Sequence, residues 1–382
     1  MIDLSGVWNP ALFDPAHPGP AVLPIPFEAI YRSALMIRHL ARIVRIDEIL
    51  PIRKADAIEA ARVGGWKVVV KKGEFAVGDL AVYFEIDAFL PEGNPAWQFL
   101  IDKQATEYTG LRGHVLRSVT LRGQLSQGLL LPLSVLSGTS SQGVAPEVGS
   151  DVTEVLGVLK YEPPIPECLL GLVIGAFPSR VHKTDQERIQ NLSIELEEWQ
   201  HRRLRWELTE KLEGQSTTFC QLDGRLHVCA RTWDLADVED NVLWRLARKL
   251  KIAESLKAHF PSRALALQGE LLGPGVEGNI YRFETPQFYL YDVYDVDEGR
   301  YWNSTDRLEL AKAFNIPHVP VLDALFELTT ETSMEKLLAM ADGMSALREG
   351  QRREGIVFKA LDEQLSFKVV SNAYLTGSSG KR

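Results

Sequence analysis

The sequence predicts an α+β fold of two domains, of which the first is a small β-barrel. Three observations carry this prediction: the length, a series of short apolar runs separated by turn residues, and a change of pattern after residue 166. At 382 residues the chain is too long for one comfortable core, and it fits two domains of about 100 to 200 residues each. The 45% hydrophobic and 24% charged residues are typical of a packed globular protein.

The barrel is predicted between residues 36 and 136. Its β-rich runs are residues 40–46, 65–70, 80–86, 115–121 and 128–132. Residues 71–73 and 77–79 carry glycine between apolar runs, as hairpin connections require residues that tolerate positive φ. Short strands with glycine turns favour an OB-type barrel, and a generic small β-sandwich is the alternative.

The remaining boundaries follow from composition. Residues 1–35 are expected to be an N-terminal extension and residues 377–382 a tail. Residues 137–166 gather Ser, Gly, Pro and acidic side chains and are predicted to be a linker. The second domain is placed at 167–376, and the charge-rich residues 185–208 predict a helix near its start, before strands begin again near position 209.

Charge and composition exclude several classes of protein. The net charge of −9 argues against a protein that coats nucleic acid, so any nucleic-acid site must be local. No run of 18 apolar residues and no basic, apolar leader is present, and the cysteines Cys168, Cys220 and Cys229 form no CxxC pair. We therefore expect a soluble cytoplasmic protein without membrane contact, and the sequence leaves its oligomeric state open.

A lysine precedes a predicted hairpin in the second domain. Lys211 lies in the segment 210–216, and a strand, a turn at Asp223-Gly224 and a second strand follow it. Gly214 would let the backbone approach a bound group, and the hairpin would bring Lys211 and Arg231 to one pocket. A KxxG tetrapeptide is common, so the alternative is a surface lysine at a strand end.

Four further segments follow in order at 268–273, 287–293, 353–359 and 365–370. They carry Glu270, Tyr291, Glu354, Lys359 and Lys368. This ordered set resembles the covalent nucleotidyltransferase superfamily of ATP-dependent DNA ligases, RNA ligases and mRNA capping enzymes. It is most similar to nick-sealing RNA ligases, in the branch with an OB-like domain N-terminal to the ligase domain. Two positions depart from the family pattern: Glu213 stands where many relatives have Asp, and Ser366 where many have a second lysine.

The resemblance implies an adenylyltransferase domain, an ATP-grasp-like ligase fold of antiparallel sheets with flanking helices. It implies that Lys211 accepts AMP, that the element around Glu270 holds the ribose and that Tyr291 stacks on the base, whereas Phe288 and Leu290 are expected in the core. Lys359 and Lys368 are expected to contact phosphates. The expected nucleotide-binding residues are Glu210, Gly214, Arg231, Glu270, Tyr291, Glu354, Lys359 and Lys368, with Glu354 and Glu270 also as ligands of Mg²⁺ or Mn²⁺.

The implied activity is that of an ATP-dependent RNA ligase with a lysyl-AMP intermediate and an AMP-capped 5′ end. RNA ends or a nicked duplex, of RNA or an RNA/DNA hybrid, are the expected partners, and RNA repair the expected role. A capping-type guanylyltransferase and a non-catalytic nucleic-acid-binding protein on a ligase fold are the alternatives. Residues 177–188 allow two interpretations, a helix cap at Thr184 or Asp185 and a basic lip over the active site.

Overall fold

The structure is a computed structural model that describes residues 39–137, 147–162 and 171–377. The expected N-terminal extension, Cys168 and residues 378–382 lie outside these ranges. No helix among the described residues is long and apolar enough to cross a membrane.

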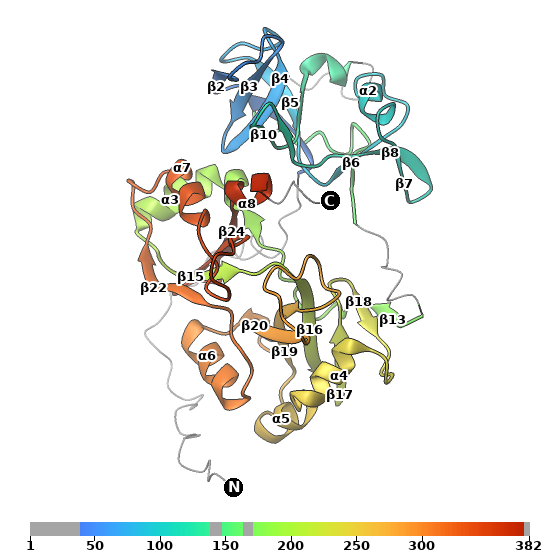
Figure 1. The fold of residues 1–382 in the computed structure, drawn as a ribbon, viewed down its shortest axis with the longest axis vertical. Coiled ribbons are helices and arrows are strands. Elements are labelled where there is room, and N and C mark those ends of the chain that lie inside the picture. Colours follow the sequence, from blue (N-terminus) through green and yellow to red (C-terminus); the bar gives the residue numbers. More distant parts are fainter. Residues whose placement is uncertain (1–38, 138–146, 163–170, 378–382) are drawn as a thin grey trace. The chain divides into compact units, whose positions relative to one another are not determined.

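Residues 39–162 contain short antiparallel strands (Figure 1). One sheet has the order β1-β5-β11, a second β2-β3-β4, a third β12-β6-β8-β7, and β9 and β10 form a hairpin. The strands are β1 Ala41–Arg45, β2 Glu48–Pro51, β3 Ile58–Val63, β4 Trp66–Lys71, β5 Leu80–Phe84, β6 Ala88–Pro91, β7 Thr106–Tyr108, β8 Leu111–Val115, β9 Val119–Leu121, β10 Gln124–Ser126, β11 Leu129–Pro132 and β12 Leu159–Lys160. The short helices are α2 Gln98–Ile101 and η2 Leu133–Leu136.

The apolar runs predicted from the sequence form strands, but their pairing differs from the expected hairpins. Strand β4 buries Trp66, Val68 and Val70 on one face, as the alternation requires. It pairs with β3 and not with β5, whose neighbours are β1 and β11. The glycine turns near 73 and 78 do adopt positive φ, so the turns are where the sequence predicts them.

Part of the segment expected to be a linker is packed. Val152, Leu156 and Val158 are buried in one cluster with Val82 and Phe84 of β5. Strand β12 pairs with β6, which extends the third sheet. The described part of 137–166 therefore contributes to the core of the N-terminal body, and the domain boundaries stay a prediction.

The second body is built on two sheets. A seven-stranded sheet has the order β13-β18-β17-β16-β19-β20-β21, and a five-stranded sheet has the order β14-β24-β23-β15-β22. Their strands are β13 Val173–Ala176, β14 Glu187–Arg188, β15 Arg205–Lys211, β16 Gln215–Leu222, β17 Arg225–Cys229, β18 Trp233–Leu235, β19 Leu265–Leu272, β20 Gln287–Asp295, β21 Arg300–Tyr301, β22 Val321–Glu327, β23 Gly355–Ala360 and β24 Ser366–Val370. The predicted hairpin at Asp223-Gly224 is confirmed, with both residues at positive φ between β16 and β17.

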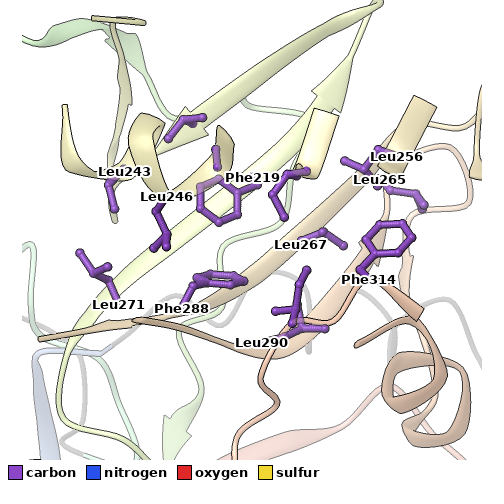
Figure 2. Close-up of a cluster of buried hydrophobic side chains, with 14 of the residues drawn as sticks. Phe219, Leu243, Leu246, Leu256, Leu265, Leu267, Leu271, Phe288, Leu290 and Phe314 are labelled. Carbon is purple, nitrogen blue, oxygen red and sulfur yellow. The ribbon is translucent and has the colours of Figure 1, made fainter. Parts of the chain in front are cut away.

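Each sheet buries one face under helices. Phe219, Leu267 and Phe288 from the seven-stranded sheet pack with Leu243 and Leu246 of α4 (Figure 2). The five-stranded sheet has its own core, to which α3 and α7 contribute. The helices are η4 Ile189–Asn191, α3 Ser193–Arg202, α4 Val242–Lys249, α5 Ile252–His259, α6 Ser304–Ala313, α7 Met334–Ala341 and α8 Asn372–Gly377.

The helix predicted in 185–208 begins later than expected. Helix α3 starts at Ser193, so the predicted cap at Thr184 or Asp185 is wrong. The preceding residues instead form β14, which pairs in parallel with β24. Arg203 ends α3 in the left-handed conformation, and strand β15 begins at Arg205.

Candidate nucleotide site

Lys211 is the last residue of β15, and alternation along this strand aims its side chain away from the core. Trp206 and Leu208 belong to the buried cluster of the five-stranded sheet, so Lys211 lies on the opposite face. Its Nζ is 2.7 Å from Oε1 of Glu354. Because Lys211 is in register with Gly355 of β23, the residue before β23 is brought to the lysine. Lys211 and Glu354, which are 143 positions apart and were predicted to act together, are therefore in contact.

Glu270 lies beside this pair on β19, in register with Ser216 of β16. Burial raises the pKa of Glu270 to about 8; the negative charge of Glu354 adds to the rise and the positive charge of Lys211 opposes it. A Cβ atom on Gly214 would lie 2.8 Å from Cγ of Glu270 and 2.4 Å from the carbonyl oxygen of Leu271. Glycine is thus required at position 214 because β19 passes directly against it.

Arg231 and Lys368 converge at a second point, on the carboxylate of Asp185. Lys368 Nζ is 3.3 Å from Oδ1 and Arg231 Nη2 is 3.6 Å from Oδ2. Burial lowers the pKa of Lys368, and the positive charge of Lys211 lowers it further. Lys368, a predicted phosphate contact, therefore lies close enough to the nucleophile to interact with it electrostatically.

Tyr291 occupies an irregular position on β20. Gln268 is in register with Asp292 and Gly269 with Leu290, so Tyr291 is the extra residue of a β-bulge. Its hydroxyl is 2.8 Å from Thr184 Oγ1 and 3.1 Å from Ser216 Oγ. Bulges redirect side chains, and here the ring lies on the side of the sheet away from the main core. The core assignment of Phe288 and Leu290 is confirmed, since both are almost fully buried.

The structure places the ammonium of Lys359 beneath Tyr291. Its Nζ is 2.6 Å from Oδ1 of Asp292, also donates to the carbonyl oxygen of Tyr291, and lies 5.7 Å from the centroid of the tyrosine ring. Burial lowers the pKa of Lys359 to about 8, although Asp292 opposes the shift. Arg307 joins the same network through Glu207 and Asp292. Lys359 therefore contacts the strand that carries Tyr291, and its expected contact with phosphates stays a prediction.

Glu210 lies on the other face of β15 from Lys211. Its carboxylate accepts a hydrogen bond of 2.8 Å from the backbone N–H of Ala346. Burial raises the pKa of this carboxyl. The side chain of Glu210 is thus engaged with the loop that precedes β23, away from the ammonium of Lys211.

Glu213, the residue that departs from the family pattern, is hydrogen-bonded to two tyrosines that lie far from it in the sequence. Its carboxylate accepts a hydrogen bond from the hydroxyl of Tyr374 in α8, and its backbone N–H donates to the hydroxyl of Tyr281 at 2.9 Å. Gly278 N–H lies 3.4 Å from Oε1 of Glu213. Sequence reasoning missed both tyrosines because neither stands in a motif.

Glu270 and Glu354 are the carboxylates expected to hold a divalent cation, and oxygen ligands of this kind suit magnesium or manganese. Desolvation and the charge of Glu354 raise the pKa of Glu270, and the charge of a bound cation would lower it again. No group of three or more Asp, Glu, His or Cys side chains among the described residues is close enough to hold a metal. Two carboxylates with water completing the shell are the pattern typical of magnesium bound with a phosphate substrate.

Comparisons with known proteins agree with this geometry. A family profile described as RNA ligase matches residues 204–370, and one described as OB-fold domain matches residues 40–133. The chain is 44% identical to Naegleria gruberi RNA ligase; it aligns over 90% of its own length and 100% of that chain, with TM-scores of 0.79 to a variant with ATP and Mn and 0.78 to the protein with pyrophosphate. A variant with AMP and Mn gives the same identity and coverage with a TM-score of 0.79. No curated protein sequence matches.

Proposed function

Because the chain belongs to the family of ATP-dependent RNA ligases, we propose that it seals nicks in duplexes, joining a 3′-OH RNA end to a 5′-phosphate end in RNA repair. The enzyme is a nucleotidyltransferase whose cofactors are ATP and a divalent metal. In the proposed sequence of steps, Lys211 attacks the α-phosphorus of ATP and becomes linked to AMP as pyrophosphate leaves. AMP then passes from Lys211 to the 5′-phosphate, and the 3′-OH attacks that phosphate to release AMP.

The contact between Lys211 and Glu354 supports the first of these steps, the linkage of AMP to the lysine. An ammonium held by a carboxylate has no lone pair for attack, so this pair has to open and Nζ has to lose a proton before it attacks the α-phosphorus. Lys368 and Arg231 lie where they can attract the phosphates and stabilise the charge that builds in the transition state. One pocket thus contains a nucleophile, a carboxylate beside it and cations for the leaving group.

The other expected residues divide into a metal side and a base side. Glu354 and Glu270 would hold the metal, which when bound offsets negative charge on the phosphates. Tyr291 is assigned to stack on adenine, and its orientation is fixed by Thr184 and Ser216. Lys359 holds the strand beneath it through Asp292.

We assign the contact with the duplex to the N-terminal barrel. OB folds bind nucleic acid through strand faces and loops with cationic and apolar side chains. The β9–β10 hairpin presents exposed Val119 and Leu121 next to Arg122, and Arg117 precedes β9. Such a hairpin suits contact with a phosphate backbone and sugar edges.

Incubation with labelled ATP or GTP and manganese, followed by denaturing electrophoresis, tests the nucleotidyl transfer. We expect label from ATP on the wild-type chain and none on Lys211→Ala, with both proteins unfolding at the same denaturant concentration. Label from GTP alone would indicate a capping-type enzyme. Label on Lys211→Ala would refute the assignment of the nucleophile.

A nick-sealing assay tests the barrel. The double variant Arg117→Ala/Arg122→Ala should form protein-AMP at the wild-type rate and seal a nicked duplex more slowly. Each lost phosphate contact lowers the dependence of binding on salt, so the salt slope should fall by about one per contact. Wild-type sealing at every salt concentration would place the duplex elsewhere.

A further inference from the structure

Three cations that come from separate parts of the chain converge on one carboxylate. Lys368 of β24, Arg231 after β17 and Lys160 of β12 lie 3.3, 3.6 and 3.8 Å from the oxygens of Asp185. Burial alone would raise the pKa of Asp185, but the charges of Lys368, Arg231 and Lys160 lower it to about 2. The cluster therefore has a strong preference for an anion.

The cluster adjoins the groups assigned to the reaction. Lys368 lies on the same face of the five-stranded sheet as Lys211, because Lys211 is in register with Gly355 of β23 and Lys368 with Val357 of the same strand. On its other side, Thr184, the neighbour of Asp185, is hydrogen-bonded to the hydroxyl of Tyr291. Asp185 thus stands between the nucleophile and the base side of the pocket.

The carboxylate of Asp185 can leave these cations at little cost. The side chains of Asp185, Lys160 and Arg231 are 43%, 41% and 69% exposed, and ion pairs in contact with water contribute little to stability. A polyphosphate carries more charge and more acceptor oxygens than one carboxylate, and it binds arginine and lysine through stronger hydrogen bonds. Such a ligand is able to displace Asp185.

We propose that Lys160, Arg231 and Lys368 form the subsite for the two phosphates that leave ATP as pyrophosphate, and that the carboxylate of Asp185 occupies this subsite when no nucleotide is bound. The proposal rests on the proposed function and extends it in two ways. The N-terminal body supplies a phosphate-binding side chain through Lys160, so it takes part in the first chemical step. Asp185 is an internal competitor that leaves as the phosphates enter.

Binding of inorganic pyrophosphate to the full-length protein, measured by titration calorimetry with manganese, tests this proposal. Asp185→Asn removes the competing charge, so binding should tighten by about fivefold. Lys160→Met removes one cation and should weaken binding by about fivefold. Two exposed residues outside the cluster provide charge-matched controls, and Asp240→Asn and Lys103→Met should bind as the wild type does.

The apparent KM for ATP in protein-AMP formation should move in the same directions as pyrophosphate binding. Weaker pyrophosphate binding by Asp185→Asn would show that Asp185 holds the ligand, through the metal or directly, and would overturn its role as a competitor. Unchanged binding by Lys160→Met, with a wild-type unfolding midpoint, would remove the N-terminal body from the subsite. Absence of protein-AMP from every nucleotide would refute the proposed function alone, because pyrophosphate binding is measured without it.

Discussion

Lys359 either stabilises the strand that carries Tyr291 or contacts the phosphates of the nucleotide. Replacement of Lys359 by methionine distinguishes these two roles. The Lys359 and Asp292 side chains are only 10% and 7% exposed, and their charged atoms are 2.6 Å apart. Removal of one partner from a buried ion pair typically costs about 3 to 5 kcal/mol, because the other charge is left without its partner. Arg307 remains 3.8 Å from Asp292, so we expect the lower end, about 3 kcal/mol, in the free energy of unfolding.

Urea unfolding of the wild type, Lys359→Met, Asp292→Asn and the double variant measures this energy. The double variant should be more stable than Lys359→Met, since it no longer buries an unpaired charge. Lys336→Met, on the exposed surface of α7, serves as the control for loss of a lysine. A loss below about 1 kcal/mol in Lys359→Met would show that the buried pair contributes little.

Ligand binding by the same variant completes the test. Lys359→Met should bind AMP more weakly and pyrophosphate as the wild type does, because its ammonium lies under the ring of Tyr291 and is bound to Asp292. An equal loss of affinity for both ligands would show that Lys359 contacts phosphates, as the sequence suggested.

Three further predictions concern the carboxylates around the nucleophile. The pKa of Glu270 is raised to about 8 in the folded protein, so the wild type should lose stability as pH rises from about 4.5 to 8, by at most about 5 kcal/mol, and Glu270→Gln should lack this loss in pH-dependent urea unfolding. Tyr374→Phe should destabilise the fold by about 1 to 2 kcal/mol and slow protein-AMP formation, because Glu213 loses a charge-assisted hydrogen bond; a wild-type rate would make that contact purely structural. Glu354→Ala should lower the rate of protein-AMP formation at least about tenfold in single-turnover assays, and an unchanged rate would mean that Glu354 does not hold the metal.

The sequence predicted those parts of the site that follow from strand register. Lys211 and Glu354 meet because each stands at the end of a strand, and the two strands are neighbours. The alternation of side chains was enough to assign Phe288 and Leu290 to the core. The order of the segments identified the family, which the comparisons show independently.

The remaining features depend on contacts that leave no local pattern. Lys359 has the same spacing whether it faces phosphates or a buried carboxylate, and only the packing of the two sheets decides between them. The bulge at Tyr291 shifts the alternation of β20 by one residue, so Val293 joins the core of Leu290, and no local pattern predicts it. Lys160 belongs to the segment assigned to a linker, so it was not expected near the nucleotide, and for the segment of Asp185 the sequence left a helix cap and a lip over the active site both open.

The parallel pairing of β14 with β24 connects the N-terminal body to the strand that carries Lys368. Asn191, three residues after β14, accepts a hydrogen bond of 2.7 Å from Trp66 Nε1 and donates to Glu85. Arg188 of β14 is in register with Lys368. The N-terminal strands therefore contact the segment that pairs with β24, so the position of the strand that holds Lys368 depends on residues of the barrel as well.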